Sequence, residues 1–111
     1  MELQANIHDT AAVISISSDI LGTPADSKEF EKNVQQMLGK GIKKLILDLA
    51  KVKRINSTGL AILITGFHLL ANSGGALSLA NLNDFVKGAL TITKLDHVFQ
   101  YYSSIDEALN A

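Results

Sequence analysis

The chain of 111 residues contains no cysteine, a single proline and few aromatic side chains, which make up 5% of its residues. The lack of cysteine excludes disulfide bonds, thiolate catalysis and metal sites built from cysteine. Charge is scarce too: charged residues make up 19% of the chain, and the formal net charge is −1. This balance offers no general electrostatic attraction to nucleic acid or to an anionic membrane. We therefore expect neither as a partner.

Long apolar runs and the features of a signal peptide are also missing. The longest apolar stretch, Leu60 to Leu70, is interrupted by Thr65, Gly66 and His68, and it falls short of the roughly 20 residues that span a bilayer. The first residues show neither the basic region nor the apolar run of a signal peptide. Apolar residues nevertheless make up 47% of the chain, which is enough for a modest core. We expect one soluble, cytoplasmic domain over residues 1–111.

The N-terminal part predicts a β-hairpin followed by a helix. Residues 3–7 and 12–17 alternate apolar with polar or small side chains, which is typical of half-exposed strands. The polar segment between them can form the turn. Thr23 and Asp26 can form a capping box around Pro24, and proline is favoured at the first position of a helix.

The rest of the chain alternates between strands and helices. The apolar run at 44–49 predicts a strand buried on both faces, as in a parallel sheet covered by helices. We expect the following elements in order: a strand at 44–49, a helix at 60–71, a strand at 76–80, a short helix capped by Asn83, a strand at 98–101, and a helix through Leu109 capped by Ser104. This order predicts an α/β fold with an N-terminal β-hairpin, a mixed, mostly parallel sheet of four to five strands and about four helices.

The most informative segment is the polar turn Asn56-Ser57-Thr58-Gly59, which delivers two adjacent hydroxyls to the start of the helix at 60–71. A hydroxyl there lies among unpaired backbone N–H groups at the positive end of the helix dipole. From the residues alone, Ser57 can cap the helix, hold an anion or carry a phosphate. We expect Asp48, at the end of the preceding strand, to hold the adjoining loop through backbone N–H groups. We expect the cluster of basic side chains before the turn to lie in a solvated loop, unless it steers an acidic partner or contacts a phosphate: Lys51, Lys53 and Arg54.

No catalytic or ligand-binding motif accompanies this turn. His8, His68 and His97 are isolated from one another and lack the spacing of metal ligands. Gly74-Gly75 follows a helix and lacks the Walker spacing, so it indicates a helix end rather than a phosphate loop. There is no nucleophile–base pair in sequence and no dinucleotide fingerprint. We expect no catalytic residue, no metal, no cofactor and no enzymatic activity.

The motifs together resemble those of a known family. A strand ending in Leu47-Asp48-Leu49 and the turn Asn56-Ser57-Thr58-Gly59-Leu60 are similar to the pattern of stand-alone STAS domains in bacterial anti-sigma factor antagonists. Gly74-Gly75, the run Thr93–Phe99 and the closing acidic helix from Ser104 extend the resemblance over nearly the whole chain.

This resemblance implies a partner-switching function. In that scheme the unphosphorylated domain binds an anti-sigma factor, which is also a GHKL-type serine kinase, and so frees a sigma factor. Phosphorylation of the domain ends the binding, and a serine phosphatase reverses it. The phosphoacceptor of the family falls on Ser57. The partner-binding surface would comprise Gly22, Thr23, Asn56, Ser57, Thr58 and Gly59.

Two residues depart from the family pattern. Asn56 stands where many members have aspartate, and it keeps the shape of a helix cap without the charge. Lys94 stands where glycine is frequent. An alternative within the fold is a small STAS accessory subunit of a transporter ATPase or a signalling scaffold, in which Ser57 is only a cap. An alternative from another class is a small α/β enzyme with an anion site at Ser57, although no acid–base groups accompany the turn.

Overall fold

The computed structural model describes residues 1–111, and its elements follow the predicted order. They are β1 (Glu2–His8), β2 (Ala11–Leu21), α1 (Pro24–Gly39), β3 (Lys44–Ile55), α2 (Ser57–Asn72), β4 (Ala76–Ala80), α3 (Asp84–Ile92), the 3₁₀ turn η1 (Leu95–His97), β5 (Gln100–Tyr102) and α4 (Ile105–Leu109). The predicted fold class is confirmed.

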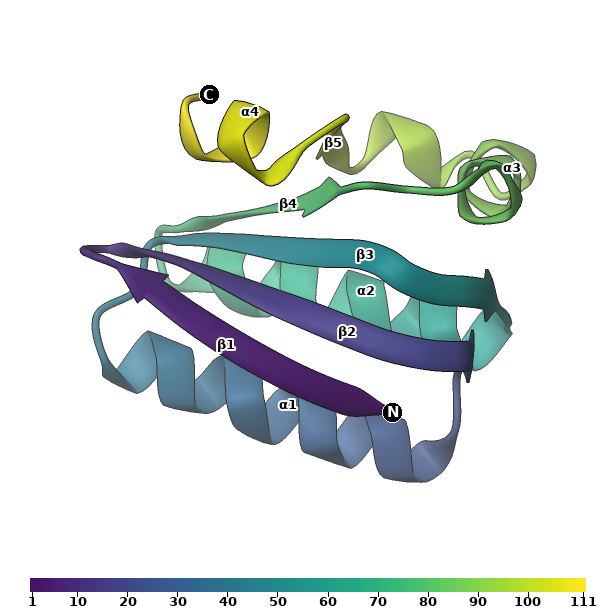
Figure 1. Ribbon diagram of the computed structural model, residues 1–111. Helices are drawn as coiled ribbons and strands as arrows, with labels where there is room; N and C mark the ends of the chain where they lie inside the picture. Colours follow the sequence, from purple (N-terminus) through teal and green to yellow (C-terminus); the bar gives the residue numbers. More distant parts are fainter.

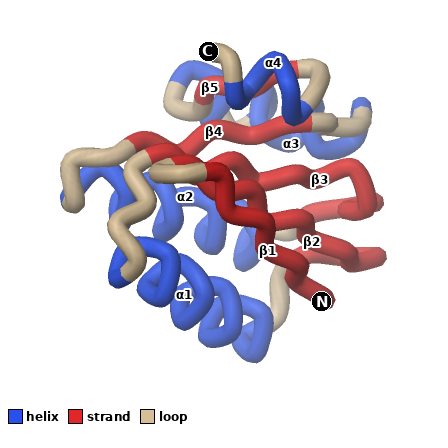
Figure 2. The backbone as a smooth tube through the Cα atoms, turned by 60° about the vertical axis from the view of Figure 1, so that its left-hand side comes forward, coloured by secondary structure: helices blue, strands red, loops and turns tan.

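A single five-stranded sheet organises the molecule. Its strands lie in the order β1-β2-β3-β4-β5. β1 pairs with β2 in antiparallel fashion, and the remaining neighbours are parallel. Helices α1 and α2 lie side by side across one face of the sheet (Figure 1). Viewed from the side, α4 lies against the β4–β5 end of the sheet, well away from β1 (Figure 2).

The main core fills the space between the sheet and helices α1 and α2. Phe30 and Val34 of α1 and Leu63 of α2 are almost completely buried there, against side chains of β2, β3 and β4. Each such side chain stabilises the fold by roughly 1.5–3 kcal/mol. A smaller cluster on the opposite face packs Ala108 of α4 against Ile46 and its neighbours. The central strand is therefore buried on both faces over its first half, as its unbroken apolar sequence predicts.

Several predicted boundaries were wrong. Strands β2 and β3 continue to Leu21 and Ile55. They extend beyond the end of their parallel neighbour β4 and form a two-stranded ribbon there. The basic cluster before the turn consequently lies on β3 and not in a loop. Helix α2 begins at Ser57 rather than at Leu60. β5 begins at Gln100, because the residues before it form η1 and a turn.

Lys94 adopts a left-handed backbone conformation, with φ 61° and ψ 20°. Glycine reaches this region without steric cost, whereas a residue with a Cβ atom is disfavoured there. The frequent glycine at this position in the resembled family thus has a conformational reason. Lysine here makes the same turn at some cost in backbone strain.

Candidate functional site

Ser57 is the first residue of helix α2, and its side chain is exposed. The preceding residue, Asn56, has an extended backbone and caps the helix, because its Oδ1 accepts a 2.9 Å hydrogen bond from the Gly59 N–H. The capping function that Ser57 alone could have served therefore belongs to Asn56. The Ser57 hydroxyl is left at the surface without a structural hydrogen bond.

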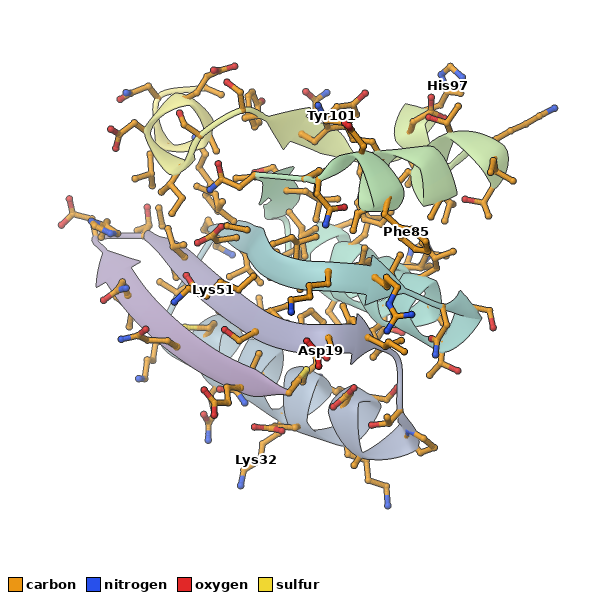
Figure 3. The ribbon with its side chains drawn as sticks, turned by 45° about the vertical axis from the view of Figure 1, so that its right-hand side comes forward. Asp19, Lys32, Lys51, Phe85, His97 and Tyr101 are labelled. Atoms are coloured by element: carbon orange, nitrogen blue, oxygen red, sulfur yellow. The ribbon has the colours of Figure 1, made fainter.

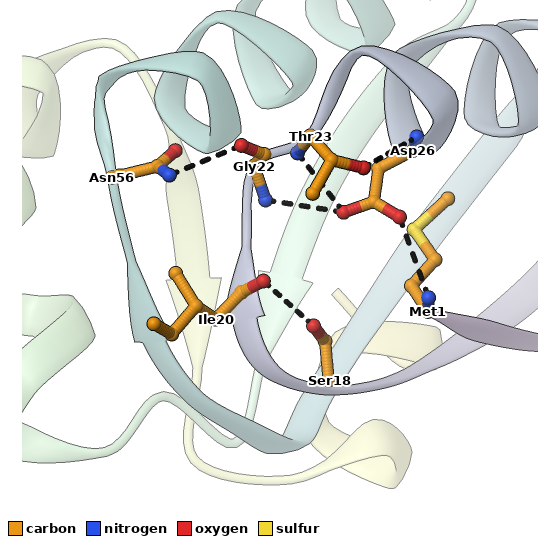
Figure 4. A network of polar contacts seen from close by, with 7 residues as sticks. All are labelled: Met1, Ser18, Ile20, Gly22, Thr23, Asp26 and Asn56. Carbon is orange, nitrogen blue, oxygen red and sulfur yellow. Dashed lines mark hydrogen bonds and ion pairs between the residues drawn. The ribbon is translucent and has the colours of Figure 1, made fainter.

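Asn56 also joins the start of α2 to the loop between β2 and α1. Its Nδ2 donates a 3.0 Å hydrogen bond to the carbonyl oxygen of Gly22 (Figure 4). Its backbone N–H donates to the carbonyl oxygen of Leu21 at 3.3 Å. Gly22 has φ +144°, and a Cβ atom there would lie 1.6 Å from Asn56 Oδ1. Glycine is thus required at this position for conformation and for space.

Asp26 fixes the other side of the same loop. Its carboxylate accepts hydrogen bonds from the N–H groups of Gly22 at 3.2 Å and Thr23 at 3.1 Å, and pairs with the α-amino group of Met1 at 3.3 Å (Figure 4). In return, Thr23 Oγ1 accepts from the Asp26 N–H at 3.1 Å, which completes the predicted capping box of α1. Burial raises the pKa of Asp26, but these hydrogen bonds outweigh it and leave the pKa below its ordinary value.

Gly59 sets how closely α2 approaches the sheet. A Cβ atom on Gly59 would lie 2.1 Å from the carbonyl oxygen of Leu21 and 2.6 Å from a side-chain carbon of Ile55. Gly59 is buried and Thr58 is half-buried, so neither is as accessible as Ser57. Of the predicted binding residues in this turn, Asn56 and Ser57 form the exposed part.

The structure brings the sequence-predicted site residues together from two segments. The loop between β2 and α1 supplies Gly22 and Thr23, and the start of α2 supplies the other four: Asn56, Ser57, Thr58 and Gly59. Sequence reasoning missed that Asp26 anchors this loop. The capping-box pattern identified its bond with Thr23, but nothing in the sequence indicated the bonds to Gly22 and Met1.

The electrostatic environment of Ser57 suits a negative group. The first turn of α2 carries no acidic side chain, and its first N–H groups have no acceptor within the helix. The helix dipole adds a partial positive charge at this end.

Among the exposed basic residues of β3, Lys53 forms a 3.3 Å ion pair with Asp19, which contributes little because both side chains are solvated. Lys51 and Asp19 project from the face of the sheet opposite α1 (Figure 3).

Asp48 belongs to a separate polar network in the middle of the sheet. Its carboxylate accepts hydrogen bonds from Ser15 Oγ at 3.0 Å, Asn81 Nδ2 at 3.0 Å and the Ala50 N–H at 3.1 Å. The predicted bond to a backbone N–H is present, although it lies within β3 rather than in a loop. Asp48 therefore ties β3 to β2 and to the end of β4.

No group of three or more histidine, aspartate or glutamate side chains lies close enough to hold a metal ion. None of the helices has the length and apolar character needed to cross a membrane.

The family model for the STAS domain matches residues 2–108. The chain belongs to the STAS domain family. A relative from Thermotoga maritima, provisionally named an anti-sigma factor antagonist, is 32% identical over 74 residues. That alignment covers 67% of this chain and 66% of the relative, just under two thirds of its length. A homolog from Thermotoga neapolitana with a corresponding name is 34% identical over the same length.

Solved structures share the STAS fold over nearly the whole chain. The crystal structure of a T. maritima protein, again provisionally named an anti-sigma factor antagonist, has a TM-score of 0.81 at 28% identity and covers 97% of this chain and 92% of its own. The anti-sigma factor antagonist SpoIIAA in its unphosphorylated form has a TM-score of 0.80, covering 98% and 94% of the two chains. Its identity of 14% makes that likeness one of fold alone.

Proposed function

We propose that this STAS domain, spanning residues 1–111, is an anti-sigma factor antagonist controlled at Ser57. It binds an anti-sigma factor through the surface formed by Gly22, Thr23 and the start of α2, and phosphorylation of Ser57 ends that binding. The names of its Thermotoga relatives support the general function. The observation that carries the switch is the exposed Ser57 hydroxyl, which caps nothing and lies at the positive end of α2.

The proposed partners are those that the resemblance to anti-sigma factor antagonists implies. The anti-sigma factor would itself be a GHKL-type serine kinase, which must dock over Ser57 in order to phosphorylate it. A serine phosphatase would restore the hydroxyl. Both act on the domain in the cytoplasm, where sigma factors work. The domain needs no catalytic residue, metal or cofactor of its own for this function.

The physical basis of the switch is a change in charge and size at a packed surface. A phosphoserine adds about −1.5 to −2 charge and three acceptor oxygens. The N–H groups and dipole at the start of α2 stabilise that charge, so the domain itself stays folded. A partner that fits closely over a hydroxyl would instead meet a bulky dianion. A loss of roughly 3 kcal/mol at the interface weakens binding about a hundredfold.

Two measurements test this proposal. Incubation with the kinase and ATP, followed by intact-mass analysis, should add one phosphate to the wild-type chain and none to Ser57→Ala. In a binding assay, Ser57→Ala should bind the anti-sigma factor and Ser57→Glu should bind it about a hundredfold more weakly.

A matched control separates the position of the charge from the charge itself. Thr65 is also exposed on α2, about 12 Å further along the helix axis. Thr65→Glu should bind the anti-sigma factor as wild type does. Equal binding by Ser57→Glu and wild type would contradict the switch and leave the interpretation as an accessory subunit without phosphoregulation.

A further inference from the structure

β1 forms an open and unprotected edge of the sheet. Its only neighbour is β2, and in an antiparallel pair every second residue directs its N–H and C=O away from that neighbour. Lysine, proline, a bulge or short length commonly prevents such an edge from pairing with another chain. β1 has none of these: its seven residues pair regularly with β2 and include neither lysine nor proline. The opposite edge, β5, is only three residues long.

The sequence of β1 is complementary to itself when a second copy runs antiparallel to it. With Ala5 at the centre, an acidic side chain meets an imidazole, a branched apolar side chain meets another, and an amide meets an amide. Side chains that oppose each other directly on one face of an antiparallel pair are in contact, and none of these pairs opposes like charges, which would be destabilising. The pairs are Glu2 with His8, Leu3 with Ile7, Gln4 with Asn6, and Ala5 with its own copy.

Symmetry selects this register. A twofold axis that pairs two identical strands in antiparallel fashion runs perpendicular to the sheet, so residues of the same face must oppose each other. The axis therefore lies between one residue and its own copy in the other chain, and not between two successive residues of a strand. An axis through Gln4 leaves Ile7 and His8 without a partner in the second β1, and an axis through Asn6 leaves Glu2 and Leu3 without one. Only the axis through Ala5 pairs all of β1.

The exposed apolar side chains of β1 give this pairing a driving force. Leu3 packs on the edge of the main core, and the alternation of a strand places Ala5 and Ile7 on the same face. Ile7 is 47% exposed in the single chain. Pairing in this register places Ile7 of each copy beside Leu3 of the other, so the apolar row becomes continuous across the axis.

We propose that two copies of this chain associate through β1, edge to edge and antiparallel, about a twofold axis at Ala5. Their sheets join into one continuous sheet. The start of β1 lies beside Asp26 and hence at the same end of the molecule as Ser57. Antiparallel pairing therefore places the two Ser57 surfaces at opposite ends of the dimer, where each stays accessible. The dimer does not depend on the function proposed for Ser57.

Cross-linking tests the axis directly, since the chain has no cysteine of its own. Residues opposite each other in an antiparallel pair have Cα atoms about 4.5–5.5 Å apart, within the range that a disulfide bridges. On oxidation, Ala5→Cys should form a covalent dimer about tenfold faster than Gln4→Cys or Asn6→Cys alone, because only residue 5 lies opposite its own copy. A mixture of Gln4→Cys and Asn6→Cys should instead form the mixed dimer. Fastest homodimer formation by Gln4→Cys or Asn6→Cys, or equal rates for all variants, would overturn the proposed axis.

Sedimentation equilibrium of the unmodified chain, from micromolar to millimolar concentration, tests the association itself. We expect a reversible monomer–dimer equilibrium. Glu2→Lys should raise the dimer dissociation constant about tenfold, because the axis doubles the effect of each altered pair. Adding His8→Glu to Glu2→Lys should restore the affinity. The matched charge change Glu31→Lys, on an exposed position of α1, should leave it unchanged. A monomer at every concentration would overturn the proposal, as would dimerisation that Glu2→Lys does not weaken.

Discussion

Asn56 uses both ends of its side-chain amide, and this explains why asparagine suits a position where the resembled family often has aspartate. Oδ1 accepts from the Gly59 N–H, and Nδ2 donates to the Gly22 carbonyl oxygen. A carboxylate can only accept, so aspartate would keep the first bond and lose the second. The asparagine thus connects the loop before α1 to the start of α2 with one side chain. It preserves the geometry around Ser57 without adding a negative charge there.

Asp26 makes the stability of the protein depend on pH. Its folded-state pKa lies below its ordinary value of 3.8, so folding favours the ionised form. The stabilisation is present above the unfolded-state pKa and is lost as pH falls through the folded-state pKa. Asp26→Asn should therefore lower the free energy of unfolding near neutral pH and flatten its decline at acidic pH. Urea unfolding between about pH 7 and about pH 3 measures both effects.

The control for this prediction is Glu31→Gln, which removes an exposed carboxylate from the middle of α1. We expect the free energy of unfolding of this variant to fall at acidic pH as that of the wild type does. If the same decline were seen in Asp26→Asn, the bonds to Gly22 and Thr23 would contribute no net stabilisation to the ionised carboxylate.

At the scale of elements, the surroundings of a helical glycine decide whether alanine in its place destabilises or stabilises the protein. In α2, Gly59 lets the first turn approach β2 within contact distance of the Leu21 carbonyl oxygen. In α3, nothing lies within 4 Å of where a Cβ atom on Gly88 would be. Gly59→Ala should destabilise the protein by about 2–3 kcal/mol through overpacking. Gly88→Ala should stabilise it by about 0.5–1 kcal/mol, because alanine favours the helix.

Chemical denaturation of the two glycine variants, analysed for the free energy of unfolding, checks this prediction. Each serves as the control for the other, since both add one methyl group to a helix. Shifts of the same sign and size would mean that helix propensity, and not the contact with Leu21, decides the effect at Gly59.

The order and type of the elements could be predicted from the sequence, because each is determined by residues within or next to it. The capping residues Thr23, Asn83 and Ser104 begin helices as predicted. The ends of β2 and β3 were not readable, because a register shift between Ser15 and Ser17 disturbs the alternation of buried side chains. Beyond that shift the two strands are held mainly by each other, so their sequences lack the apolar run of a central strand.

The candidate site was predictable only in its parts. The turn around Ser57 is recognisable by its residues, and the resemblance supplied Gly22 and Thr23. The contact between Asn56 and Gly22 joins residues 34 positions apart, and no local pattern indicates such a pairing. The same holds for Asp26, since its bond to Met1 depends on where β1 lies in the sheet.

At the scale of the whole molecule, the position of Ser57 separates stability from binding. A negative charge at the start of α2 interacts favourably with the helix dipole, and the exposed side chain displaces nothing from the core. Ser57→Glu should therefore leave the fold intact and raise the free energy of unfolding by up to about 1 kcal/mol at low salt. Added salt should reduce this gain, because the interaction is screened at the surface.

Thr65→Glu provides the comparison, because Thr65 lies in the interior of α2 where the dipole has little effect. This variant should show no gain in unfolding free energy at any salt concentration. Denaturation of both variants at low and high ionic strength measures the difference. Amide chemical shifts should change only near the start of α2 and the Gly22–Thr23 loop in Ser57→Glu. A destabilised Ser57→Glu, or shift changes spread across the sheet, would mean that a phosphate at Ser57 acts by disrupting the domain and not by blocking its surface.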